Sequence, residues 1–263
     1  MKKVKKYFIA VIGAIIAGSC FYLFWLCPRY TVPILMYHSF ENAPAKDNLV
    51  TISPDHFEQQ MAFLRKNGYH VISLDELVNG LKYGRKFSHN TVVITIDDGY
   101  QNNYTYAYPI LKKYGFPATI FLATNLMESK DMYLTWTEIK EMSQNNIYFG
   151  GHTKNHVYLP SIMDKDVLWD EIAGSKEMIE KHMGHSVGYF CYPTGGFTEE
   201  VKNLVKKAGY KGACTTNRGS DFLNRQEFYE LNRVSVRNAD YSLSFWAKLS
   251  GYYNLFRKLR PAS

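Results

Sequence analysis

The stretch TVVITIDDG, residues 91–99, joins a buried-strand pattern to two consecutive carboxylates, and this combination indicates both the fold and the position of a site. Its first six residues are apolar or β-branched, which is typical of a strand covered on both faces. Asp97 and Asp98 follow directly. Two adjacent carboxylates at the end of a buried strand are unfavourable unless a cation lies beside them, and a metal ion would meet that need. The alternative for this motif alone is an ordinary Asp-Asp-Gly turn.

Strand and helix patterns alternate on both sides of this stretch. Strands are predicted at Val32–Tyr37, His70–Ile72, Thr91–Ile96, Ala118–Ala123, Ile147–Gly150, Gly188–Tyr192, Tyr210–Thr215 and Leu231–Val236. Helices are predicted at Ser53–Lys66, Leu74–Leu81, Asn103–Tyr114, Thr135–Ser143, Asp164–Met183 and Thr198–Ala208. The alternation predicts an α/β fold with parallel strands, a (β/α) barrel of about seven strands that is closed or imperfectly closed. In such folds the chemistry collects at the carboxyl ends of strands.

A second polar cluster, GHTKNH at residues 151–156, follows another of these predicted strands. The i, i+4 spacing would place His152 and His156 on one side of a helical turn, where both can bind one ion. Two imidazoles and one carboxylate leave open positions on zinc or a similar ion, as a hydrolytic site requires. The second carboxylate is then free to act as a base.

A third strand end carries the segment FCYPTGG, residues 190–196. Its Pro-x-Gly turn can present a backbone N–H to a substrate oxygen, although without context it is only a turn. Cys191 and Cys214 end two predicted strands, and no CxxC or other metal-type spacing is present among the four cysteines. Buried free thiols are therefore the simplest interpretation of this pair.

Together these segments resemble the motifs of the polysaccharide deacetylases with a NodB-type domain, carbohydrate esterase family 4. TIDDG at 95–99 is similar to the first motif, GHTKNH to the second and residues 190–196 to the third. The stretches PILMYH (33–38), LTW (134–136) and GYKGACTT (209–216) are most like the branch that holds the poly-β-1,6-N-acetylglucosamine deacetylases. The resemblance covers about Val32 to Val236.

The resemblance implies a distorted (β/α) barrel that hydrolyses N-acetyl groups of a polymeric N-acetylated glycan with one divalent metal ion. Zinc is the expected ion, with cobalt or nickel as alternatives. The implied metal ligands are Asp98, His152 and His156. The implied catalytic groups are Asp97 as general base and the backbone N–H of Thr194 for the oxyanion. Tyr192 and Pro193 are the implied substrate contacts.

The chain departs from the family pattern at two places. Cys191 stands where many members have an arginine that orients the base, and Leu231-Asn232-Arg233 stands where many have Leu-x-His. Arginine cannot donate a proton near neutral pH, so the general acid has no assignment, and His38 and Asp221 are candidates for supporting roles. Hydrolysis of O-acetyl groups, or glycan binding without catalysis, are the alternative functions.

The ends of the chain carry the other signals. Lysines within residues 1–6 precede the uncharged stretch 7–26, which at about 1.5 Å per residue is long enough to cross a bilayer of about 30 Å. It predicts an uncleaved transmembrane signal anchor with the deacetylase domain, residues 31–240, on the extracellular side of the cell membrane. In residues 241–263, apolar residues recur at helical spacing with basic residues between them. This pattern predicts a basic, aromatic helix that packs on the barrel or lies on anionic headgroups. The net charge of +7 favours an anionic partner, but no nucleic-acid-binding signature is present.

Overall fold

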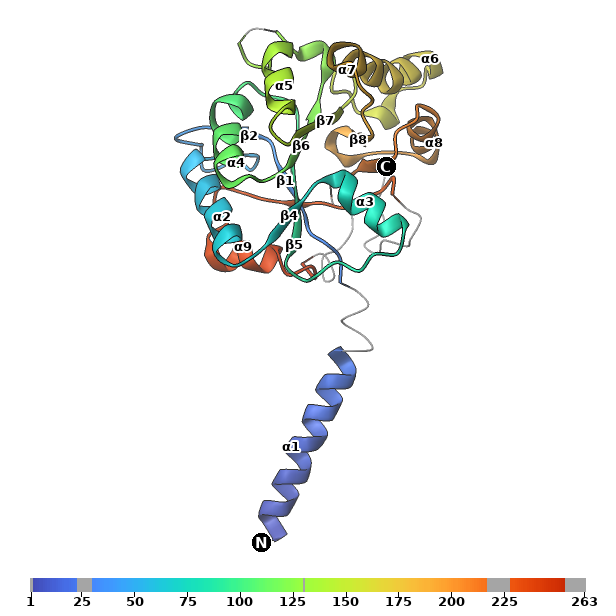
Figure 1. Cartoon of the computed structure of the whole chain (residues 1–263). Coiled ribbons are helices and arrows are strands. Elements are labelled where there is room, and N and C mark those ends of the chain that lie inside the picture. Colours follow the sequence, from blue (N-terminus) through green and yellow to red (C-terminus); the bar gives the residue numbers. More distant parts are fainter. Residues whose placement is uncertain (1, 23–29, 130, 217–227, 254–263) are drawn as a thin grey trace. The chain divides into compact units, whose positions relative to one another are not determined.

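The computed structural model describes residues 2–22, 30–129, 131–216 and 228–253 (Figure 1). These residues form two compact units, Met1–Thr31 and Val32–Ser263. The first unit contains one helix, α1, Lys2–Cys20. It begins within the lysine cluster and not after it, because lysine is a good helix former. Among the described residues, no helix combines the length and apolar character needed to span a bilayer. The last part of the predicted span, residues 23–26, lies outside the described residues.

The second unit is built on an eight-stranded parallel sheet in the order β10-β1-β5-β6-β7-β8-β9, with β4 paired to β5 (Figure 1). Its strands are β1 Ile34–Tyr37, β4 His70–Ile72, β5 Thr91–Ile96, β6 Ala118–Leu122, β7 Ile147–Gly151, β8 Tyr189–Cys191, β9 Gly212–Cys214 and β10 Val234–Ser235. A separate two-stranded sheet pairs β2 Ser39–Phe40 with β3 Thr51–Ile52. The predicted parallel α/β fold is thereby confirmed.

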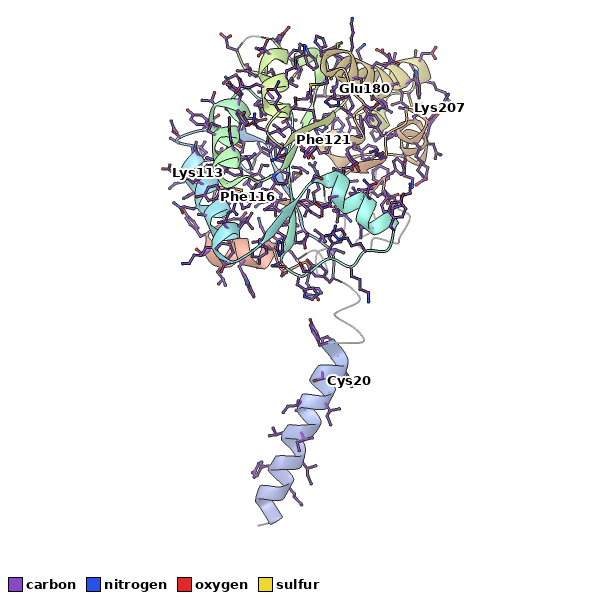
Figure 2. The ribbon with its side chains drawn as sticks, viewed as in Figure 1. Cys20, Lys113, Phe116, Phe121, Glu180 and Lys207 are labelled. Atoms are coloured by element: carbon purple, nitrogen blue, oxygen red, sulfur yellow. The ribbon has the colours of Figure 1, made fainter. Side chains whose placement is uncertain are left out.

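The two ends of the large sheet meet through the segment that leads into β10. Leu231 forms a parallel bridge with Cys214 at the end of β9, while Val234 pairs with Leu35 of β1. Every residue of β5 is buried, in agreement with its apolar composition. Figure 2 shows the side chains of this unit, among them Phe121 of β6, which is fully buried. The largest cluster of buried apolar side chains joins strand residues such as Ile94 and Ile120 to helix residues such as Leu64 and Ile139, so the main core lies between the strands and the helices.

Helices connect successive strands, and several of them begin at polar caps that the sequence marks clearly. Ser53, Ser73 and Thr198 each accept a hydrogen bond from the first turn of a helix, and Thr135 forms a full capping box with Glu138. The α-helices are α2 Pro54–Lys66, α3 Leu74–Lys82, α4 Tyr108–Tyr114, α5 Trp136–Ser143, α6 Lys165–Trp169, α7 Ser175–Met183, α8 Glu199–Lys207 and α9 Ser242–Lys248.

Two predicted helices are interrupted. The segment Asn103–Tyr114 begins as a π-helix, η3 Asn103–Ala107, and Asp164–Met183 contains the π-helix η6 Asp170–Gly174 between α6 and α7. Short 3₁₀ turns occur at η4 Thr124–Leu126, η5 Leu159–Ser161 and η7 Pro193–Gly195. Residue periodicity cannot distinguish a π-turn from an α-turn, so a continuous α-helix was the wrong prediction in both places.

The C-terminal segment is helical at α9, where Phe245 and Leu249 are buried. The ring of Phe245 meets Phe63 of α2 edge-on with centroids 5.8 Å apart. Packing on the barrel is thus confirmed for these residues. Leu243 and Trp246 of the same helix are 78% and 55% exposed, and residues 254–263 lie outside the described part of the chain. Membrane contact by this segment stays a prediction.

Candidate active site

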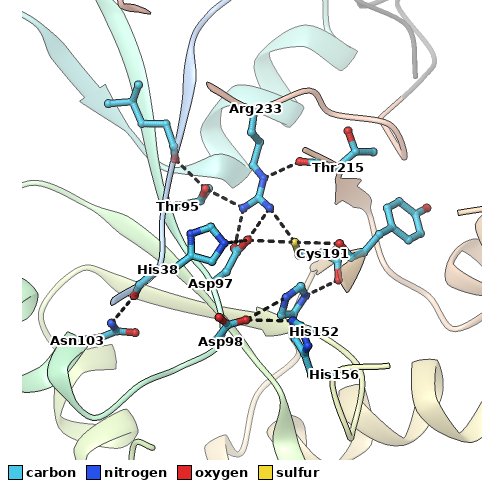
Figure 3. Close-up of polar contacts among 12 residues, drawn as sticks. His38, Thr95, Asp97, Asp98, Asn103, His152, His156, Cys191, Thr215 and Arg233 are labelled. Carbon is cyan, nitrogen blue, oxygen red and sulfur yellow. Dashed lines mark hydrogen bonds and ion pairs between the residues drawn. The ribbon is translucent and has the colours of Figure 1, made fainter. Parts of the chain in front are cut away.

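Polar side chains gather where β5, β7 and β8 end, at one edge of the parallel sheet (Figure 3). Asp97 and Asp98 follow β5, His152 follows β7, and Cys191 is the last residue of β8. The sequence therefore predicted correctly that these strand ends come together. Arg233, from the segment before β10, also points into this cluster.

Three of the predicted residues converge as a candidate metal site. Asp98 Oδ1 lies 3.4 Å from His152 Nε2 and 3.2 Å from His156 Nε2, and all three atoms lie within 4.8 Å of one another. Ligands bound tetrahedrally at 2.0–2.1 Å from zinc stand about 3.3 Å apart. The spacing thus fits an ion of that size with at least one further coordination position.

The hydrogen bonding around these atoms also fits a cation. His152 Nδ1 lies 2.7 Å from the backbone oxygen of Cys191, so a neutral His152 carries its proton on Nδ1 and turns the lone pair of Nε2 toward Asp98. Asp98 Oδ1 is buried and has no hydrogen-bond donor among the described residues. Burial alone would raise the pKa of Asp98, but hydrogen bonds and positive charge from the two imidazoles outweigh it and hold that pKa well below its usual range. The buried carboxylate therefore needs positive charge beside it, which either a cation bound between Asp98 and the Nε2 lone pairs or protonated imidazoles supply.

The histidine pair does not lie on a helical turn, which corrects the expectation from its spacing. Residues 152–156 form an irregular loop in which Thr153 and His156 have φ of 64° and 54°. Asp98 and Thr194 also have positive φ, 75° and 55°. Non-glycine residues seldom adopt this region, and such strain gathers at functional sites where the surrounding structure enforces it. The loop brings both imidazoles to Asp98 by this conformation.

Asp97 forms an ion pair with Arg233 beside the candidate metal ligands. Arg233 Nη1 donates to Asp97 Oδ1 at 2.6 Å and Nη2 to Oδ2 at 2.7 Å, a bidentate ion pair in which Asp97 is 3% and Arg233 1% exposed. The other N–H groups of Arg233 donate to Thr215 O (2.7 Å), Thr95 Oγ1 (3.1 Å) and Cys191 Sγ (3.0 Å). All five donors of the guanidinium are therefore used.

Arg233 thus orients the carboxylate of Asp97, the role that an arginine at the position of Cys191 has in many family members. Burial would raise the pKa of Asp97, but the charge and hydrogen bonds of Arg233 outweigh burial, so the pKa lies below its ordinary value and the carboxylate is ionised. The Cys191 thiol, whose pKa burial raises, lies 3.8 Å from Asp97 Oδ2. Asp97, His152 and Cys191 also lie close enough to bind an ion, but Arg233 already occupies both oxygens of Asp97.

His38, at the end of β1, faces the same carboxylate. Its Nε2 lies 3.7 Å from Asp97 Oδ2, and its backbone oxygen accepts a hydrogen bond from Asn103 Nδ2 at 2.8 Å. Burial lowers the pKa of His38, and Asp97 offsets this in part. An imidazole in this position can hold or release a proton beside the base. Asp221, the other candidate from the sequence, lies outside the described residues.

The third motif forms the turn that the sequence predicted. Gly195 and Gly196 donate backbone hydrogen bonds within it, to Tyr192 O and Pro193 O, whereas Thr194, directly before Gly195, is exposed. Tyr192 is fully buried and its ring stacks on Phe197 at 4.9 Å between centroids, so its side chain packs in the core and does not face a substrate. Pro193 is also buried.

An aromatic pair that the sequence did not single out lies next to the metal ligands. The rings of Tyr100 and Tyr133 are stacked with centroids 5.3 Å apart, and both side chains are partly exposed. Burial and the nearby charge of Asp98 raise the pKa of both phenols, so they are neutral hydrogen-bond donors. No local signal separates these two among the 21 tyrosines of the chain.

Comparison with known proteins gives one consistent result. Residues 84–213 match the family model described as polysaccharide deacetylase. YxkH of Bacillus subtilis (strain 168), whose name places it among the polysaccharide deacetylases, is 36% identical over 205 residues, which are 78% of this chain and 71% of that protein. The poly-β-1,6-N-acetyl-D-glucosamine N-deacetylase of Staphylococcus aureus (strain MSSA476) is 27% identical over 191 residues, 68% of this chain and 66% of that one. The Streptococcus pyogenes deacetylase PplD, solved in complex with acetate, superposes with a TM-score of 0.76 at 30% identity, covering 83% of this chain and 97% of that one.

Proposed function

The chain belongs to the polysaccharide deacetylase family, and on that premise we propose that it removes N-acetyl groups from an extracellular polymer containing N-acetylglucosamine. The observation that carries the proposal is the arrangement of Asp98, His152 and His156 around one point, with the Arg233-bound Asp97 beside it. Three ligands with an open position and a separate ionised base are what amide hydrolysis by a metalloenzyme requires.

A divalent ion held by Asp98, His152 and His156, which we propose to be zinc, would polarise the acetamide carbonyl and the attacking water. Asp97 accepts the proton of that water, since Arg233 keeps its carboxylate ionised. The backbone N–H of Thr194 donates to the carbonyl oxygen as negative charge develops there. The proton taken up by Asp97 passes to His38, whose Nε2 lies 3.7 Å from Asp97 Oδ2, and His38 delivers it to the leaving amine; among the described imidazoles, His38 faces Asp97 and is not one of the three metal ligands.

The relatives and the aromatic pair support the choice of polymer. The Staphylococcus aureus relative is named as a poly-β-1,6-N-acetyl-D-glucosamine N-deacetylase. The stacked, partly exposed rings of Tyr100 and Tyr133 offer an apolar surface with phenol hydroxyls beside the metal ligands. Such a surface suits the apolar face and the hydroxyl groups of a pyranose ring. We therefore propose a β-1,6-linked N-acetylglucosamine polymer as the substrate class.

Acetate release from defined oligosaccharides tests this proposal. Oligomers of β-1,6-linked N-acetylglucosamine are expected to yield one free amine for each acetate, and the chelator-treated protein is expected to yield none. Acetate released from O-acetylated glycans without new amines would replace the proposal with an esterase. If no acetylated glycan is hydrolysed by the metal-loaded protein, a glycan-binding role replaces it.

We also propose that the domain works at the outer face of a cell membrane, anchored through the N-terminal segment. Lysines precede the uncharged residues 7–26, an arrangement that retains the lysines in the cytoplasm. The protein is expected to keep its N-terminus and to stay with the membrane fraction after high-salt washing. Recovery of a soluble form that begins near Cys20 or Pro28 would contradict the anchor.

A further inference from the structure

The loop that carries both metal-binding histidines, residues 152–156, is held on one side by backbone hydrogen bonds. Thr124 N donates to Thr153 O at 3.2 Å and Asn125 N to Lys154 O at 2.8 Å. These bonds fix one edge of the loop. They leave open what enforces the positive φ at Thr153 and His156, a conformation that a free loop would leave.

The other side of the loop is held by a single buried carboxylate, Glu171. Its Oε2 accepts the backbone N–H groups of Lys154 (2.9 Å) and Asn155 (3.0 Å), and its Oε1 accepts Asn155 Nδ2 at 2.5 Å. Glu171 is 5% exposed and forms no ion pair among the described residues. A buried acid is unfavourable unless it is fully hydrogen-bonded, and here the loop supplies every donor.

The π-helix η6 places Glu171 against the loop. The helical run from Lys165 to Met183 is α-helical except at Asp170–Gly174, where the wider turn shifts the side chains that face the sheet. Asp170, next in the same turn, pairs with Lys154 Nζ at 2.8 Å. A Cβ on Gly174 would lie 2.8 Å from Asp170 Oδ1 and 2.9 Å from Lys154 Cδ, so a side chain there would displace this ion pair.

We propose that Glu171 is a positioning residue for the metal site: through η6 it holds residues 152–156 in their strained conformation and so keeps His156 ready to bind the ion. The inference rests on the proposed metal site but not on the choice of substrate. No contact with the glycan or with the reacting atoms is involved, and the effect reaches the chemistry only through the loop.

The test is Glu171→Gln, measured as the affinity of the purified full chain for Zn²⁺ and as the visible absorption of its Co²⁺ form. Glutamine has nearly the same size but is uncharged and turns an N–H₂ group toward the loop's donors. The affinity is expected to fall about 10- to 100-fold, as for other residues that orient metal ligands, with a changed Co²⁺ spectrum. Asp170→Asn is the matched control: it removes the exposed ion pair in the same turn and is expected to leave both readouts within about 2-fold.

Thermal unfolding of the metal-free variants separates positioning from plain stability. A purely structural Glu171 would lower the unfolding temperature without changing the affinity of the folded protein, and that result would overturn the inference. If Glu171→Gln does not fold, Asn155→Ala replaces it: it removes one donor to Glu171 and keeps the two backbone bonds. Asn125→Ala, which removes the hydrogen bond from Asn125 Nδ2 to Asn155 Oδ1 that Asn155→Ala also loses, is its control. The affinity of Asn155→Ala is expected to fall several-fold, and an unchanged affinity would equally overturn the inference. A wild-type protein that binds no divalent ion would instead refute the proposed function.

Discussion

Replacing Asp97 with asparagine is expected to lower kcat by about 10²–10⁴-fold while the metal ion stays bound, the loss typical of a removed general base. Asp97 is hydrogen-bonded to Arg233 and is not one of the three proposed metal ligands, so the substitution removes none of Asp98, His152 and His156. Asparagine keeps one oxygen that accepts a hydrogen bond from Arg233, turns an N–H₂ group toward the other guanidinium N–H, and cannot take a proton from water. Steady-state acetate release and metal content of the purified variant provide the measurement.

Two further variants bracket this result. His152→Ala is expected to lose the ion together with the activity, since it removes a ligand. His38→Gln is expected to keep the ion and to lose hydrolysis of the acetamide far more than hydrolysis of an activated aryl acetate, whose leaving group needs no proton. An Asp97→Asn protein that deacetylates at the wild-type rate would exclude Asp97 as the base. Equal losses on both substrates for His38→Gln would exclude His38 as the acid.

Local sequence signals were sufficient for the strands and for the positions of the site residues. The buried pattern of residues 91–96 and the helix caps at Ser53 and Thr135 each depend on neighbours within a few positions, so they can be predicted from the chain alone. The site followed because the carboxyl ends of parallel strands meet at one edge. That is why the convergence of Asp98, His152 and His156 was predictable.

The missed features depend on contacts between distant segments. The loop at residues 152–156 owes its conformation to Glu171 and to residues 124–125, so the spacing of its histidines indicated a helical turn that does not form. The sequence pattern identifies Arg233 only as a residue that cannot replace a proton donor. Its function depends on the bridge between Leu231 and Cys214. This bridge fixes the segment that contains Arg233 next to the end of β9, where the guanidinium reaches Asp97. The combination of Cys191 at the vacated arginine position with an arginine in the last motif was the available signal.

Replacing Arg233 with methionine is expected to lower the free energy of unfolding by about 3–5 kcal/mol, because it leaves the buried Asp97 without its partner.

The same change is expected to raise the pKa of Asp97, which Arg233 lowers in the wild type. In the wild type Arg233 holds that pKa below its ordinary value, so the ionised carboxylate stabilises the fold above the unfolded-state pKa, and this is lost as the pH falls through the folded one. In the variant burial is the larger influence and raises the pKa. The acidic limb of the pH–rate profile is therefore expected to move to higher pH, and stability to fall as the pH rises. Urea unfolding and pH–rate profiles measure both effects.

The double variant Asp97→Asn/Arg233→Met distinguishes loss of the ion pair from loss of packing. It buries neither charge, so it is expected to recover much of the stability that Arg233→Met loses, whereas a defect from lost packing against Phe121, whose ring lies 5.7 Å from the guanidinium carbon, would persist. Arg233→Lys keeps the charge but has three N–H donors in place of five, too few for the contacts that Arg233 makes with Asp97, Thr215, Thr95 and Cys191. Its stability is expected to lie between those of the wild type and Arg233→Met. If Arg233→Met and Arg233→Lys unfold at the wild-type urea concentration and keep the wild-type pH profile, Arg233 does not set the ionisation of Asp97.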